Sequence, residues 1–174
     1  MLRTTLDNVG QQRTLRPLYA QHQATPYGCY LDPEFDREVD ILPGMVMTRL
    51  EGEVVTLFGH GDDASTHEVF GLSGLFVAPR MGIDELINTG MNNFATWVGD
   101  EQAVFEVLAP AFDTSATWET PTGGASTPLF VTDSAHEEGP GKLTPSGTGK
   151  VAAHLIEVVS DNKIIVSLDK TAAA

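Results

Sequence analysis

The stretch VAAHLIEVVSDNKIIVSLD (residues 151–169) decides the fold, because it predicts a β-hairpin on its own. Two runs rich in β-branched residues flank Asp161-Asn162, a pair suited to a tight turn between antiparallel strands. In the second run apolar and mostly polar residues alternate, and the apolar set is Ile164, Val166 and Leu168. This period of two predicts a strand that packs one face against a core.

Upstream of the hairpin, short apolar runs separated by turn residues extend the β pattern. The chain contains 17 Gly and 10 Pro, scattered along its length, which favours many turns and short strands. Strands are predicted within VDILPGMVMTRL (39–50, with a turn at Pro43-Gly44), GEVVTLFG (52–59), EVFGLSGLFVAP (68–79), NFATWVG (93–99) and AVFEVLAPAF (103–112). The two glycines inside 68–79 predict a bulge or a tight barrel corner. The sequence therefore indicates a mainly β protein.

One short helix is predicted over GIDELINTG (82–90). Ile83, Leu86 and Ile87 fall on one face, Asp84 and Glu85 occupy the first turn, and Gly90 can end the helix.

The chain divides into an arm and a body. Residues 1–33 are polar, with isolated apolar residues and no sustained period, and predict an extended N-terminal arm that orders on binding. An unstructured tail or a cloning leader without a role is the alternative. Residues 34–174 predict a single β-rich domain, in which 113–150 form a Gly-, Pro-, Ser- and Thr-rich excursion with a strand around 128–132.

Charge separates these two parts. The chain carries 24 acidic and 10 basic side chains, a net charge of −14, and such a surface repels phosphate backbones, which argues against nucleic-acid binding. The arm has Arg3, Arg13 and Arg16 against Asp7 alone, whereas no Lys or Arg occurs between Arg80 and Lys142. The acidic body either steers partners or serves colloidal solubility.

Cysteine content and hydropathy restrict the compartment in which the protein is expected to fold. The one cysteine, Cys29, rules out an internal disulfide and a cysteine-based zinc site. No apolar run reaches the length of a signal peptide or of a membrane-spanning helix. We therefore expect synthesis and folding in a cytoplasm, with no membrane partner.

Searches for catalytic chemistry find only weak matches. Ser73 in GLSGL (71–75) misses the nucleophile-elbow spacing, because position 75 is Leu. SGTGKV (146–151) lacks the first glycine of a phosphate loop and has Val151 where a Ser or Thr would hold magnesium. HGDDASTHE (60–68) gathers His60, Asp62, Asp63, His67 and Glu68 without a known ligand spacing, so it predicts a solvated loop. We predict no enzymatic activity, no metal site and no cofactor.

A set of ordered blocks resembles a known family. DILPGMVMTRL (40–50), GEVVTLFG (52–59), FGLSGLFVAPRMGIDEL (70–86) and NNFATWVGDEQAVFEVLAPAFD (92–113) resemble the head decoration proteins of tailed bacteriophages, especially those of actinobacteriophages, and distantly the phage lambda decoration protein. The resemblance implies a small β-tulip-like or β-barrel-like domain on the capsid exterior of the virion. It also implies a trimer that fastens neighbouring major capsid subunits.

In the lambda-type relatives the N-terminal arm adds backbone pairing to a capsid strand edge, and an extended segment such as residues 1–33 suits that mode. The hypothesis is non-covalent docking by the aliphatic, basic and aromatic residues of the arm, namely Leu2, Arg3, Leu6, Arg13, Leu15, Arg16, Leu18 and Tyr19. The long arm and the large 113–150 excursion depart from the short relatives.

A second function remains open at the level of sequence. A small β-barrel could bind carbohydrate or another ligand at a virion or cell surface through exposed aromatic side chains, for which the candidates are Trp97, Trp118, Tyr27 and Tyr30. Trp97 lies in an apolar strand and is expected in the core, so Trp118 is the better exposed candidate.

Overall fold

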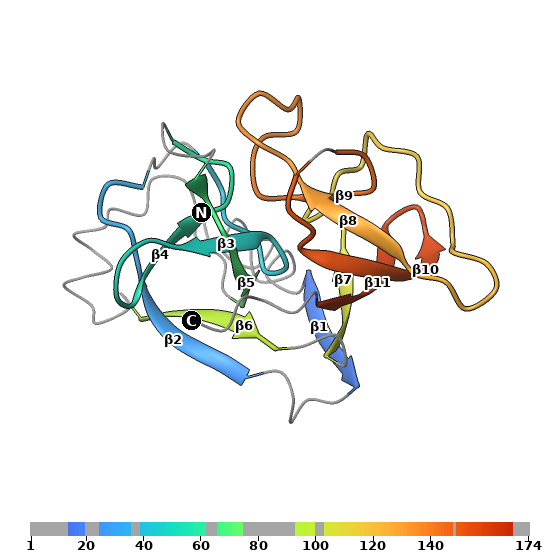
Figure 1. Ribbon diagram of the computed structural model, residues 1–174, viewed down its shortest axis with the longest axis horizontal. Coiled ribbons are helices and arrows are strands. Elements are labelled where there is room, and N and C mark those ends of the chain that lie inside the picture. The colour runs from blue at the N-terminus through green and yellow to red at the C-terminus, as the bar shows by residue number, and fades with distance from the viewer. Residues whose placement is uncertain are drawn as a thin grey trace, which may run out of the picture.

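The computed structural model describes residues 14–19, 25–35, 39–61, 66–74, 93–99, 103–147 and 149–168. Their strands form two units that lie side by side, a closed barrel and a six-stranded sheet (Figure 1). This confirms the mainly β, barrel-like prediction, while the helix predicted over 82–90 lies outside the described residues. In the described ranges no helix is long and apolar enough to cross a membrane.

The barrel closes in the order β2-β4-β3-β5-β6. Its strands are β2 (Thr25–Leu31), β3 (Val46–Arg49), β4 (Val54–Leu57), β5 (Val69–Ser73) and β6 (Asn93–Val98). All neighbours pair antiparallel except β2 and β4, which are parallel. Closure leaves the barrel without the two outer strands that an open sheet would expose.

The six-stranded sheet has the order β1-β7-β11-β10-β8-β9. Its strands are β1 (Leu15–Tyr19), β7 (Val104–Leu108), β8 (Thr127–Val131), β9 (Leu143–Thr144), β10 (Ala153–Ser160) and β11 (Lys163–Leu168). The hairpin predicted over 151–169 is confirmed as β10 and β11, joined at Asp161-Asn162. Ile164, Val166 and Leu168 are all buried, as their alternation predicts.

The glycines of β5 allow a close approach between barrel strands. A Cβ on Gly71 would collide with the backbone oxygen of Trp97 on β6, and one on Gly74 would lie 3.1 Å from the Ala95 oxygen. The register between β3 and β5 also shifts between Met47 and Thr48. This register shift fits the bulge, one of the two alternatives predicted from these glycines.

A single cluster of buried apolar side chains runs through both units. It joins barrel residues such as Met47 and Leu57 to sheet residues such as Phe105 and Phe112, and Trp97 packs edge-on against Phe105 with ring centroids 5.9 Å apart. Burial of this continuous core stabilises the barrel and the sheet together.

Backbone hydrogen bonds also cross the junction between barrel and sheet. Val46 N–H donates to the Gly141 oxygen (2.7 Å), and Ser134 N–H donates to the Gly59 oxygen (3.1 Å). Gly141 has a positive φ of 82°, and a Cβ there would collide with the side chain of Leu57. These contacts leave little room for one unit to slide over the other.

Two stretches within the predicted arm form strands of the two sheets. Residues Leu15–Tyr19 form β1 and pair with β7, and Thr25–Leu31 form β2 and pair with β6. Their partners are 63 to 92 residues away along the chain, so no local period reveals them. Pro17 within β1 adds to the coil-like appearance, yet β1 is an edge strand, where proline is tolerated.

Candidate binding surfaces

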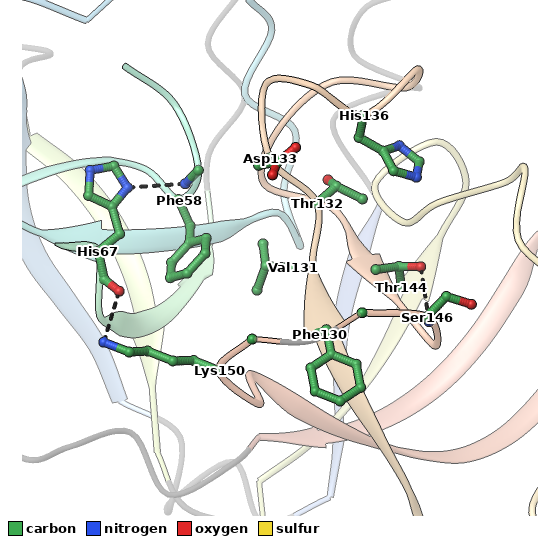
Figure 2. A pocket seen from close by; sticks show the side chains of 13 residues that line it. Phe58, His67, Phe130, Val131, Thr132, Asp133, His136, Thr144, Ser146 and Lys150 are labelled. Atoms are coloured by element: carbon green, nitrogen blue, oxygen red, sulfur yellow. Dashed lines mark hydrogen bonds between the residues drawn. The ribbon is translucent and has the colours of Figure 1, made fainter. Parts of the chain in front are cut away.

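An open groove of about 600 Å³ lies at the junction of the barrel and the sheet (Figure 2). Phe58, Phe130 and Val131 supply its apolar lining, while Asp133 and His136 are among its polar residues. The lining comes from β8, β9 and the loops beside them together with the segment that follows β4, so the groove exists only because the two units are joined.

On one side of the groove, the side chain of Lys150 links the sheet to the barrel. Lys150 Nζ donates to the His67 backbone oxygen (3.2 Å) and pairs with the Glu68 carboxylate. His67 is buried, and its Nδ1 accepts a hydrogen bond from Gly59 N–H (3.1 Å). Lys150, the lysine of the SGTGKV segment, is thus engaged in a structural contact, which fits a loop that leads into β10.

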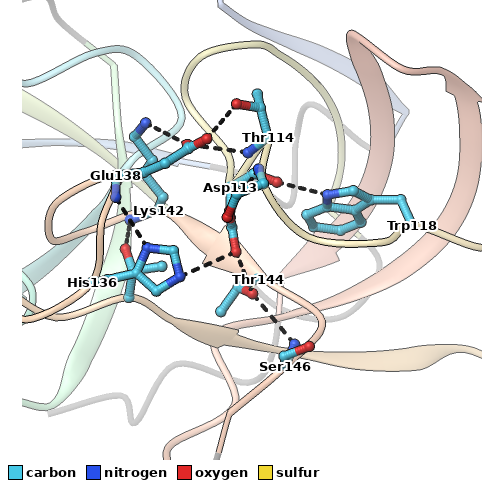
Figure 3. Close-up of polar contacts among 10 residues, drawn as sticks. Asp113, Thr114, Trp118, His136, Glu138, Lys142, Thr144 and Ser146 are labelled. Atoms are coloured by element: carbon cyan, nitrogen blue, oxygen red, sulfur yellow. Dashed lines mark hydrogen bonds and ion pairs between the residues drawn. The ribbon is translucent and has the colours of Figure 1, made fainter.

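A polar network fixes the 113–150 excursion (Figure 3). Asp113 has a side chain only 2% exposed, and its carboxylate accepts hydrogen bonds from Ser115 Oγ (2.7 Å) and Thr144 Oγ1 (2.9 Å). His136 Nε2 lies 3.4 Å from the same carboxylate. A buried carboxylate is tolerated when several donors surround it, so this network holds three distant parts of the excursion in place.

A second acidic residue of the excursion is paired with a cation. Glu138 Oε2 lies 2.8 Å from Lys142 Nζ, and the Thr114 hydroxyl and N–H also donate to this carboxylate. Burial alone would raise the pKa of Glu138, but the hydrogen bonds from Lys142 and Thr114 overcome it and lower the pKa to about 2. The excursion is thus a folded part of the body, and an ion pair within it contributes to its stability.

The residues considered for catalysis or metal binding have structural roles where they are described. Ser73 is buried in β5, and its N–H donates to the Met45 oxygen (2.7 Å). His60 packs on Phe35 (ring centroids 4.9 Å apart), while Asp62 and Asp63 lie outside the described residues. Within the described ranges, no three His, Cys, Asp or Glu side chains are grouped so that they could hold a metal ion.

The aromatic candidates for ligand binding are mostly packed. Trp118, expected to be exposed, donates its Nε1–H to the Asp113 oxygen (2.7 Å) and packs edge-on against Phe112. Tyr27 packs against Phe70 with centroids 5.6 Å apart. Tyr30 alone of the four candidates is largely exposed, at 42%. A single exposed ring gives no aromatic platform for a sugar.

Large exposed apolar side chains occur in two pairs among the described residues. Tyr30 and Leu50 (47% exposed) lie at the barrel tip, where Tyr30 is aligned with Val54 and Leu50 N–H donates to the Val54 oxygen (2.9 Å). Ile156 (40%) and Val159 (47%) lie on β10. The tip and β10 belong to different units, at opposite sides of the view in Figure 1.

The residues assigned to capsid docking by the arm fall into two groups. Leu2, Arg3, Leu6 and Arg13 lie outside the described residues. The other four, Leu15, Arg16, Leu18 and Tyr19, lie in β1. Leu15 packs against the core, and Arg16 donates to Glu106 Oε2 (3.0 Å), so these two residues already have partners inside the chain.

Sequence reasoning did not select Ile156 or Val159 as surface residues. Both sit in apolar runs that are typical of a core, and in the structure each lies at a register shift in the pairing of β10 with β11.

The fold and these surfaces define a class of protein: an acidic, mainly β body with paired apolar side chains exposed on each of its two units. The family model described as phage cement protein matches residues 1–174, so the chain belongs to the phage cement protein family. Membership supports a capsid-stabilising decoration function in the phage virion, as a structural component. No curated protein matches the chain.

Proposed function

We propose that this protein decorates the outside of an icosahedral phage shell and bridges neighbouring major capsid subunits by non-covalent contacts. The observation that carries the proposal is the match of the phage cement protein family over the entire chain. Bridging and arm-mediated docking draw support from the surfaces described above and from the charge distribution. The trimer is what the resemblance to head decoration proteins implies.

Bridging requires two docking surfaces on one stiff body. The exposed pairs Tyr30–Leu50 and Ile156–Val159 lie on different units, and a shared core and backbone hydrogen bonds join those units. A body of this kind can hold two subunits at a fixed spacing, because strain at one end is resisted at the other. Many weak contacts of this type give high avidity on a repeating lattice.

The arm supplies a third contact in this proposal. Because residues 14–19 are committed to β1 and its start, the docking segment is residues 1–13, with Leu2, Leu6, Arg3 and Arg13 as its anchors. Its basic side chains are opposite in sign to the acidic body and suit an acidic patch of the capsid surface.

Removal of residues 1–13 tests arm-mediated docking without cutting into β1. Occupancy on expanded capsids of the cognate phage, measured by quantitative gel analysis after sedimentation, should fall at least about tenfold. A variant with Arg3→Gln and Arg13→Gln should lose less, with the larger loss at low salt, because screening weakens exposed charge pairs.

Undiminished occupancy after removal of residues 1–13 would reject the role of the arm while leaving bridging by the body intact. Thermal unfolding of the shortened protein serves as the control for folding. Cryo-microscopy of decorated particles tests the trimer and bridging directly, through density that spans two capsid subunits.

A further inference from the structure

Two β-bulges place the exposed aliphatic side chains of β10. In the pairing with β11, Leu155 faces Val166 and Glu157 faces Ile165, so Ile156 is an extra residue. The same shift recurs between Val158 and Ser160 and leaves Val159 as a second extra residue. Bulges re-aim side chains, and here each bulge residue is a β-branched aliphatic side chain that is more than one-third exposed.

The outer edge of β10 is open beside these residues. On that side β8 pairs with β10 only through Ala153–Leu155, and in the described ranges no strand continues the pairing towards Ser160. Val158 N–H donates to Thr120 Oγ1 (3.0 Å), and the Thr120 hydroxyl donates back to the Val158 oxygen (3.4 Å).

Both backbone groups of Val158 therefore point away from β11, as they do in a non-hydrogen-bonded pair of an antiparallel ladder. The Thr120 hydroxyl occupies the position at which the backbone of a further strand would form two hydrogen bonds with Val158. Thr120 belongs to a loop whose residues are mostly exposed, so a segment with a backbone N–H and C=O can take its place.

The charges beside this edge indicate the chemistry of the partner. Glu119, Glu157 and Asp161 are all exposed and flank Thr120, Ile156 and Val159 along the chain. Lys163, the nearest cation in sequence, is paired with Glu106 at 3.2 Å. An extended segment that carries a Lys or Arg between apolar side chains complements this edge in both charge and polarity.

We propose that the bulged edge of β10, comprising Thr120, Ile156, Val158 and Val159, docks an extended basic segment of a major capsid subunit. The segment covers Ile156 and Val159 and pairs with Val158 in place of the Thr120 hydroxyl. This inference rests on the proposed function and names the surface of the body that contacts the shell.

Substitution at the two bulges tests the surface. The variant Ile156→Thr with Val159→Thr keeps the β-branched shape and removes exposed apolar area, so its thermal unfolding should match that of the parent. Its occupancy on cognate capsids that lack the protein should fall about tenfold or more. The matched control Val151→Thr makes the same Val-to-Thr change at a partly exposed residue before β10 and should leave occupancy within about twofold of the parent at equal folded fraction.

Thr120→Val tests the edge itself. The change keeps the shape of the side chain and removes the hydroxyl that competes with the partner, so capsid binding should tighten about fivefold. A loss of binding in this variant would overturn the role given to Val158.

A cross-link identifies the occupant. Cys29 is only 1% exposed, so a maleimide-benzophenone probe can be attached selectively at Val159→Cys, with Ser126→Cys as an exposed control position. Irradiation on capsids should join position 159, and not position 126, to a lysine- or arginine-containing peptide of the major capsid protein. Cross-links solely to a second copy of this chain, or unchanged occupancy in the double Thr variant, would overturn the proposal. Failure of the parent protein itself to bind capsids would instead reject the proposed function on which the inference rests.

Discussion

Gly59 lies against the backbone of Thr132, so close that a Cβ on Gly59 would stand 2.7 Å from the Thr132 oxygen. Gly59 ends the barrel segment that contains β4, and Thr132 follows β8 of the sheet. With a φ of +75°, Gly59 also has a backbone conformation that other residues adopt only with strain. The junction of the two units therefore depends on the absence of one side chain.

Gly59→Ala should destabilise the protein by about 3 kcal/mol or more, because the methyl group meets backbone atoms that cannot rotate away. Gly61→Ala is the matched control, since Gly61 also has a positive φ (+86°) but a Cβ added to it would have no atom within 4 Å. It should cost only about 1–2 kcal/mol. Urea unfolding of both variants measures the difference, and equal losses would show that Gly59 is required for its backbone conformation alone.

Glu106→Gln should loosen β1 selectively. The Glu106 carboxylate is 11% exposed and pairs with Arg16 at 3.0 Å and Lys163 at 3.2 Å, so it joins β1, β7 and β11. The neutral amide weakens both pairs, and amide hydrogen exchange in β1 should rise about tenfold while exchange in β4 stays constant. Equal acceleration in both strands would indicate global destabilisation instead.

Acid should weaken the excursion through Glu138. Its pKa of about 2 lies below the ordinary value of 4.5, so its contribution to folding is complete above about pH 5 and is lost as the pH falls towards 2. Glu138→Gln should cost about 1–2 kcal/mol at pH 7, and the gap from the parent should narrow steadily below pH 5. Urea unfolding at a series of pH values checks this, and a gap independent of pH would contradict the role of the charge.

Asp113→Ala should cost about 2–3 kcal/mol, because Thr144 and Ser115 lose a buried acceptor. Asp113→Asn keeps one acceptor oxygen and should cost less. Near-ultraviolet circular dichroism of Trp118, whose indole N–H donates to the Asp113 backbone oxygen, reports whether the excursion stays in place. A variant that unfolds with the parent's midpoint would show that the network is not needed for stability.

Strong local patterns in the sequence were enough to predict several elements. The β10–β11 hairpin, β4, β6, β7 and the strand near residue 128 all occur where β-branched or alternating residues predict them. These elements can be predicted because apolar alternation and turn residues act over a few positions.

Pairing over long sequence distances could not be predicted in the same way. The segments LRPLY and TPYGCYL contain proline and isolated apolar residues, and they become strands only because β7 and β6 offer them edges. Trp118, the better exposed candidate, is only partly exposed, because it packs against Phe112 and donates to the Asp113 oxygen. Candidate surfaces share this difficulty, because the exposure of Ile156 and Val159 depends on strand register.

The composition of β1 has a consequence for a protein that must be crowded on a shell at high local concentration. An outer strand with a complete set of backbone donors invites a second copy to add its own strand, and repetition of that step leads to fibres. Pro17 lacks an N–H, and at the opposite end of the six-stranded sheet β9 is only two residues long. Both ends are thus poor templates for a further strand, which would let many copies stand close together while each remains a separate folded unit.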